Sequence, residues 1–152
     1  MQLKGKNVLI TGGTRGIGKC MVEELVKGGV TNIAVIARDK QNLKQLSDEF
    51  EDVKFIKIAG DIANIEVLRD ASARIEDKWG HLDILINNAG VSVFDDFMER
   101  TEKDLDYVYD VNLKGTLNSI QSFVKCYKEN DQKNGSIVNI GSLYGVVSPD
   151  FK

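Results

Sequence analysis

The first residues that could do chemistry are the glycines that follow the first apolar run. Gly12, Gly16 and Gly18 follow Thr11 in the pattern Thr-Gly-x-x-x-Gly-x-Gly, and a stretch of helical period begins at once. Glycines at a strand-to-helix turn let the backbone approach a pyrophosphate, whose charge then lies at the helix N-terminus. The spacing is not the common G-x-G-x-x-G, because Met21 stands at the last glycine position. An ordinary tight turn explains only one or two of these glycines, so the pattern predicts a dinucleotide site.

Charged residues beside this turn could distinguish between two dinucleotides. Arg38 and Asp39 follow the second apolar run, and Arg15 lies within the glycine turn. Two guanidiniums that converge on one dianion favour a ribose 2′-phosphate, whereas an acidic residue would bind the ribose diol. Asp39 could be such a diol ligand, or it could only cap the helix that follows. The sequence therefore favours NADP(H) over NAD(H).

Two further polar residues stand where a reaction could use them. Asn112 shares a helical face with Leu105 and Val108, so its amide is expected to be buried and to need partners. It is either a structural asparagine that bonds a neighbouring carbonyl or part of a reaction centre. Ser142 ends the fifth apolar run, at the edge where open α/β sheets bind ligands. No acid or histidine is arranged to make Ser142 a nucleophile, and the only histidine, His81, is expected to be structural.

Five short, β-rich apolar runs must position these residues. The runs are almost continuously apolar, which predicts strands buried on both faces, as in a parallel sheet. Stretches of helical period separate them, and this alternation gives βαβ units with right-handed crossovers. The predicted strands are residues 7–11, 32–37, 53–58, 82–86 and 136–140.

Capping residues mark the ends of the intervening helices. Asp39 can cap a helix over residues 40–50, and Asn64 can cap one that ends before Gly80. Thr101 and Asp104 form a capping-box pattern that opens a long helix to about Lys128. A further helix, residues 16–27, ends at two glycines. The predicted fold is a doubly wound, Rossmann-type α/β domain with helices on both faces of the sheet.

Composition excludes several other classes of protein. The chain has 152 residues, with 20 Lys and Arg against 23 Asp and Glu, a net charge of −3. This mixed charge argues against a nucleic-acid partner, and no apolar run approaches the length of about 18 residues that a membrane span needs. No signal peptide is apparent, and the two cysteines, Cys20 and Cys126, suit a reducing compartment. A single cytoplasmic domain is expected.

The order of the motifs resembles that of the classical short-chain dehydrogenase/reductase family. Besides the glycine turn, the resemblance rests on an Asp-Ile pair, an Asn-Asn-Ala-Gly sequence, a helical asparagine motif and a serine after the fifth run. It covers almost all 152 residues. These segments are Asp61–Ile62, Asn87–Gly90, residues 110–115 and residues 138–142.

The resemblance implies a role for each motif. Asp61 would accept a hydrogen bond from the adenine amino group, unless it only caps the next helix, and the Ile62 backbone would contact the ring edge. Residues 88–90 would lie against the adenosine ribose, unless they form a plain turn. Asn112 would open its helix locally and hold a water in a proton relay, and Ser142 would hydrogen-bond the substrate oxygen. No metal site is expected, and the implied cofactor-binding residues are Gly12, Thr14, Arg15, Gly16, Ile17, Gly18, Arg38, Asp61, Ile62, Asn88, Ala89 and Gly90.

The family's general acid does not occur in this sequence. That acid is the tyrosine of a Y-x-x-x-K motif, and none of Tyr107, Tyr109, Tyr127 and Tyr144 has a lysine four residues later. Residues 1–152 therefore resemble an incomplete NAD(P)-binding domain, truncated after the fifth strand. The chain could be a fragment, a truncated gene product or part of a longer protein, and alone it is expected to be inactive.

Three functions compete at this point. The leading hypothesis is hydride transfer between NADP(H) and a carbonyl or alcohol substrate, with the complete protein a homodimer or tetramer. The alternative is a non-enzymatic nucleotide-binding or interaction module on the same fold, but nucleotide binding alone requires neither Ser142 nor Asn112. A sugar-nucleotide epimerase is disfavoured, because the Thr-Gly-x-x-Gly pattern of that branch would need glycine in place of Arg15.

Overall fold

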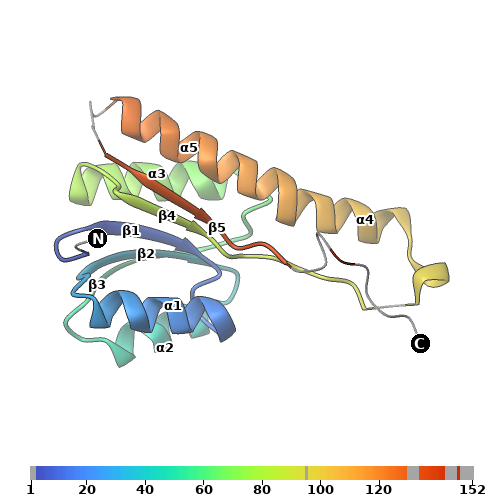
Figure 1. Ribbon diagram of the computed structural model, residues 1–152, viewed down its shortest axis with the longest axis horizontal. Coiled ribbons are helices and arrows are strands. Elements are labelled where there is room, and N and C mark those ends of the chain that lie inside the picture. Colours follow the sequence, from blue (N-terminus) through green and yellow to red (C-terminus); the bar gives the residue numbers. More distant parts are fainter. Residues whose placement is uncertain (1–2, 95, 130–133, 143–146, 148–152) are drawn as a thin grey trace.

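A five-stranded parallel sheet forms the centre of the computed structural model, which describes residues 3–94, 96–129, 134–142 and 147. The strand order is β3-β2-β1-β4-β5, so the chain builds outward from β1 in both directions. Helices α1 and α2 cover one face, and α3 and α5 cover the other (Figure 1). The predicted doubly wound α/β fold is confirmed. The strands are β1 (Asn7–Thr11), β2 (Asn32–Ala37), β3 (Lys54–Ala59), β4 (Ile84–Asn87) and β5 (Ser136–Asn139).

The helices begin and end close to the predicted positions. One long helical rod is divided into α4, a π-helical segment η2 and α5, and the α4 end of the rod extends past the carboxyl ends of the strands (Figure 1). Among the described residues, no helix is both long and apolar enough to span a membrane. The helical elements are α1 (Gly16–Lys27), α2 (Lys40–Glu49), α3 (Ile65–Trp79), the 3₁₀ turn η1 (Phe97–Glu99), α4 (Glu102–Tyr109), η2 (Asp110–Gly115) and α5 (Thr116–Glu129).

The predicted capping residues make the expected hydrogen bonds. The Asp39 carboxylate accepts from the Gln41 and Asn42 amides, and the Asn64 side chain accepts from the Glu66 amide. Thr101 and Asp104 form a complete capping box at the start of α4. These short contacts satisfy N–H groups that have no partner within the helix.

The sheet is not buried on both faces along its whole width, which corrects one expectation. The central strands β1 and β4 are buried at every position, whereas only alternate residues of β3 are buried and β5 is mostly exposed. Lys57 and Ala59 are exposed on the face of β3 opposite the buried Ile56 and Ile58, and Lys54 is exposed at the start of the strand. Because β3 and β5 lie at the two edges of the sheet, each pairs with only one other strand. Their apolar residues are therefore less covered than those of the central strands.

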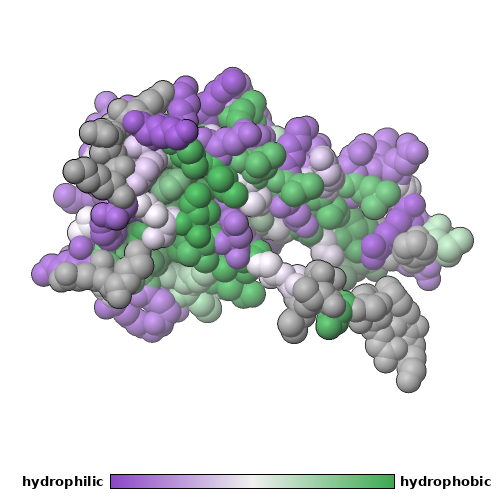
Figure 2. Space-filling view, turned by 45° about the horizontal axis from the view of Figure 1, so that its top comes forward, coloured by the Kyte–Doolittle hydropathy of each residue, from purple (hydrophilic) through white to green (hydrophobic). Residues whose placement is uncertain are grey.

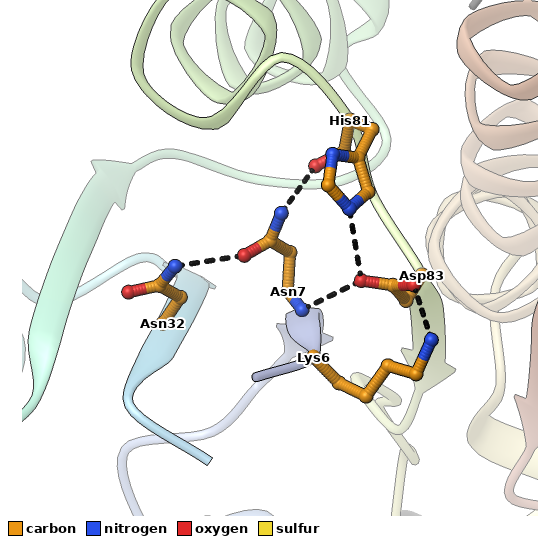
Figure 3. A network of polar contacts seen from close by, with 5 residues as sticks. All are labelled: Lys6, Asn7, Asn32, His81 and Asp83. Atoms are coloured by element: carbon orange, nitrogen blue, oxygen red, sulfur yellow. Dashed lines mark hydrogen bonds and ion pairs between the residues drawn. The ribbon is translucent and has the colours of Figure 1, made fainter. Parts of the chain in front are cut away.

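A polar network holds the amino ends of the strands together (Figure 3). The buried Asp83 carboxylate accepts from the Asn7 amide at 2.9 Å and from Lys6 Nζ at 2.8 Å, and His81 Nε2 lies 3.3 Å away. Asn7 in turn bonds the His81 carbonyl and Asn32. Burial alone would raise the pKa of Asp83, but the hydrogen bonds from Asn7 and Lys6 lower the pKa below its usual value. Strand β4 begins at Ile84, two residues later than predicted.

Candidate functional site

A cleft of about 540 Å³ opens at the carboxyl ends of the strands. Every residue that the sequence marked for cofactor binding lines this cleft, from Gly12 in the first turn to Gly90 after β4. The fold therefore brings four separate segments of the sequence to one place. Asp39, the alternative ligand of the ribose diol, lines the cleft as well. The remaining lining residues, which the sequence did not single out, are Ile36, Ala37, Asn42, Gly60, Val91 and Val111.

The glycine turn has a backbone that other residues would not fit. Gly12 and Gly16 have φ angles of 69° and 52°, in the left-handed region that favours glycine. At Gly18 a Cβ atom would lie 2.1 Å from the Gly12 carbonyl oxygen. The close approach lets α1 begin directly at the cleft, and the first N–H groups of a helix have no acceptor within it. The turn can accordingly receive an anion.

Thr11 ties this turn to the end of β4. Its hydroxyl accepts hydrogen bonds from the Asn88 amide at 3.1 Å and the Ala89 amide at 3.0 Å. The Asn88 side chain donates back to the carbonyls of Thr11 and Gly12, both at 3.1 Å. Asn88 and Ala89 are thus fixed against the glycine turn.

The charged residues of the cleft lie around Arg38. Arg38 Nη1 donates a hydrogen bond to the hydroxyl of Tyr107 and lies 4.0 Å from Asp61 Oδ2. Asp61 also accepts from the Ala63 amide at 3.0 Å, while Asn64 provides the cap of α3. Asp39, at the next position, caps α2. Capping was one of the two roles that the sequence allowed for it, the other being a ligand of the ribose diol.

Arg15 and Ile62 also line the cleft. Arg15 is exposed and precedes α1 without capping it through its side chain. Ile62 is buried, and a Cβ on Gly115 would lie 2.9 Å from Ile62 Cγ1. Glycine at that position allows η2 to pack closely against the cleft wall.

Asn112 lies in η2 but is exposed, so the expectation of a buried amide was wrong. Its helical neighbour Leu105 is 62% exposed, because nothing among the described residues covers that face. The amide nevertheless has partners: it donates to the Val91 carbonyl and accepts from the Val91 amide, both at 2.8 Å. The π-helical segment provides the local opening of the helix that the resemblance implied.

Ser142 follows β5, as predicted, but at a greater separation from the strand end. Strand β5 ends at Asn139, and Ser142 follows three residues later, exposed and not among the described residues that line the cleft. The β5 pairing with β4 stops at Asn87, so the strand is shorter than its apolar sequence indicated. Tyr144 lies outside the described residues.

Sequence reasoning missed two side chains that organise the site. Thr11 was noted only as part of the glycine pattern, although a hydroxyl at a strand end is a signal for local hydrogen bonding. Tyr107 was considered only as a possible acid. Its contact with Arg38 spans 69 positions of sequence, and no local pattern indicates it.

A parallel sheet in this strand order, with a glycine turn leading into a helix at its carboxyl edge, defines a Rossmann-type domain of the nucleotide-binding class. The sequence matches the family model described as short chain dehydrogenase over residues 6–151. The chain belongs to the short-chain dehydrogenase family.

Curated relatives in this family have named activities. A 3-oxoacyl-acyl-carrier-protein reductase (FabG) of Thermotoga maritima is 36% identical over 150 residues, which cover 96% of this chain and 59% of that protein. A 3alpha-hydroxysteroid dehydrogenase of Mediterraneibacter gnavus is 30% identical over 152 residues, covering 96% and 59%. The chain thus spans about three-fifths of the length of these relatives.

Solved structures give the same assignment. A short chain dehydrogenase from Leptospira borgpetersenii with bound NAD⁺ has a TM-score of 0.86 at 34% identity, covering 97% of this chain and 56% of that one. A short chain dehydrogenase from Bacillus anthracis has a TM-score of 0.90 at 28% identity, covering 98% and 60%.

Proposed function

We propose that this chain is the cofactor-binding portion of an oxidoreductase that prefers NADP(H) over NAD(H) and acts on a carbonyl or alcohol substrate. The observation that carries the proposal is that both Arg15 and Arg38 line the cleft together with the glycine turn. The Leptospira borgpetersenii relative holds NAD⁺, so a preference for the 2′-phosphate has to come from this chain's own cations. Asp39 caps α2 through Oδ1, which is the capping role that the sequence allowed for it.

The residues of the cleft fit a dinucleotide. Because Gly18 has no Cβ, the Gly12 carbonyl and the Asn88 side chain pack directly against it, and the first N–H groups of α1 beside it would donate hydrogen bonds to a pyrophosphate. Asp61 and the Ile62 backbone would hold the adenine ring. Asn88, fixed by Thr11, would position the backbone of residues 88–90 against the adenosine ribose.

The remaining roles concern the substrate. When bound, the nicotinamide supplies or accepts the hydride. Ser142 would donate a hydrogen bond to the substrate oxygen, and Asn112, anchored on Val91, would hold a water in the path of the proton. A positioned proton donor accelerates such steps by about 10²–10⁴-fold, and this role belongs to a Y-x-x-x-K motif that the printed sequence does not contain.

Self-association and a cytoplasmic location are part of the same proposal. The rod formed by α4, η2 and α5 presents apolar side chains among polar ones, as can be followed in Figure 2. Four of them recur every fourth residue and are all more than half exposed, which is typical of a face that packs against another helix. Two cysteines in a chain of this length fit a reducing compartment. The four residues are Leu105, Tyr109, Leu113 and Leu117.

The test is calorimetric titration of the chain with NADPH and with NADH. Charge-assisted contacts to the 2′-phosphate should make NADPH bind about 10–100-fold more tightly. Arg38→Ala should remove most of this difference. Equal affinities in the unsubstituted chain, or a preference for NADH that Arg38→Ala leaves unchanged, would contradict the cofactor assignment.

A second measurement separates the enzyme from a module that only binds nucleotide. A longer form of the protein that carries a Y-x-x-x-K segment should reduce carbonyl substrates with NADPH, and Ser142→Ala in that form should sharply lower the rate. Tight NADPH binding without turnover in that form would favour the non-enzymatic module.

A further inference from the structure

The hydrogen bond between Arg38 and Tyr107 joins two elements that otherwise stand apart. Arg38 follows β2, whereas Tyr107 lies on α4, in the part of the helical rod that extends past the strand ends (Figure 1). Tyr107 does not line the cleft, but Arg38 does. Tyr107 therefore reaches the cleft only through the guanidinium that it contacts.

The two neighbours of Arg38 act on its charge in different ways. The Asp61 carboxylate, 4.0 Å from Nη1, is too distant for a hydrogen bond and attracts the guanidinium without fixing its orientation. The Tyr107 hydroxyl accepts a directional hydrogen bond from the same Nη1 atom. A phenol oxygen is neutral, so it orients the guanidinium without cancelling the charge that a phosphate would need.

The guanidinium keeps donors for a ligand. It has five N–H groups, and within the described part of the chain its partners contact only Nη1. The Arg38 side chain is 54% exposed, so without a holding contact it would sample many rotamers. Binding a phosphate would then cost the entropy of ordering that side chain, a cost that preorganisation removes.

We propose that Tyr107 is a positioning residue for cofactor selectivity: its hydroxyl holds Arg38 so that Nε and Nη2 face the ribose 2′-phosphate of NADP(H). This inference rests on the proposed function of the cleft. Tyr107 itself touches no cofactor atom. Its removal should weaken the binding of the phosphorylated dinucleotide and leave the binding of NAD(H) nearly unchanged.

The experiment is a double-mutant cycle on the chain, made from Tyr107→Phe, Arg38→Ala and the combination of both. Calorimetry gives the Kd for NADPH and NADH, and adenosine 2′,5′-bisphosphate against 5′-AMP tests the adenosine end alone. A hydrogen bond to a charged group at a half-exposed site corresponds to a change of about three- to tenfold. Tyr107→Phe should raise the Kd for NADPH and for the bisphosphate by that factor, with less than about a twofold change for NADH and 5′-AMP.

The double variant and a matched control show whether Tyr107 acts through Arg38. In the Arg38→Ala background, Tyr107→Phe should have no further effect on either dinucleotide, because the group that it positions is gone. Tyr109→Phe removes a hydroxyl from the same helix, from a side chain that is 58% exposed, and should bind both dinucleotides like the unsubstituted chain.

Failure of this inference differs from failure of the proposed function. If Arg38→Ala abolishes NADPH preference but Tyr107→Phe retains it, Tyr107 has no positioning role and the cofactor assignment stands. The inference is equally overturned if Tyr107→Phe weakens NADPH and NADH by the same factor, since that indicates a structural role. If the unsubstituted chain does not prefer NADPH, both the cofactor assignment and the role of Tyr107 are wrong.

Discussion

Replacing Gly18 with alanine tests whether the glycine turn binds a ligand or is only a tight turn of the backbone. The added Cβ would lie 2.1 Å from the Gly12 carbonyl oxygen and 2.6 Å from Asn88 Nδ2. Carbon and carbonyl oxygen ordinarily approach to about 3.3–3.6 Å, so the two backbones must separate by about 1 Å. The same displacement would stretch the 3.1 Å hydrogen bond from Asn88 to Gly12.

The expected effect on stability follows from this overlap. Overpacking of this kind costs about 1–3 kcal/mol. For a chain of this size each kcal/mol lowers Tm by about 2–4 °C, so a fall of about 2–12 °C is expected. NADPH affinity should fall by about tenfold or more, because hydrogen bonds to a pyrophosphate tolerate only a few tenths of an ångström.

The matched control is Gly80→Ala at the end of α3. Gly80 has a φ of 73° and open space around it, so alanine there costs about 1–2 kcal/mol of backbone energy without touching the cleft. Thermal unfolding and NADPH titration of both variants give the comparison. Both should lose stability, but only Gly18→Ala should lose affinity. Equal NADPH affinity in Gly18→Ala and the unsubstituted chain would refute the assignment of this turn to the pyrophosphate.

Three further outcomes are expected. The lowered pKa of Asp83 means that its carboxylate stabilises the fold fully above the ordinary Asp value of about 3.9, and that this contribution is lost as pH falls below it. Asp83→Asn should thus lower the free energy of unfolding by about 1–3 kcal/mol at neutral pH and make it depend less on pH in the acid range. The same pH dependence in both proteins, measured by denaturant titrations, would contradict this. Sedimentation velocity should show self-association of the chain, and Leu113→Lys should reduce it; a dispersed monomer before substitution would refute the role of the exposed helical face. The 152-residue chain should consume no NADPH with ketones, aldehydes or acyl thioesters, so turnover that Ser142→Ala abolishes would reveal a proton donor not yet identified.

Local signals in the sequence were sufficient for most of the fold. Asp39, Asn64 and Thr101 each act within three residues of their own position, so their capping role can be read from spacing alone. The residues of the cleft were also predictable, because strand ends of one parallel sheet meet at one edge. Their contacts with a cofactor remain predictions.

Features that depend on neighbours distant in sequence were not predictable. Whether β3 or β5 is covered on a second face depends on which strands and helices lie beside it, and their own residues do not encode this. Leu105 has an apolar side chain at helical spacing, yet it is exposed because no described element packs on that side. The contact between Arg38 and Tyr107 depends on how far α4 extends past the sheet, which no short pattern determines.

The two edges of the sheet show why ligand chemistry belongs at the carboxyl ends. At the amino edge the side chains of the polar network bond one another: Asn7 contacts Asn32 and the His81 carbonyl, and Asp83 takes three partners.

The carboxyl edge has the opposite character. The N-terminus of α1 and the free donors of the Arg38 guanidinium face the cleft with no acceptor of their own among the described residues. An anionic ligand binds through donors that the protein has not already used, and a helix N-terminus adds to their effect. The cleft at the carboxyl edge is therefore suited to a dinucleotide.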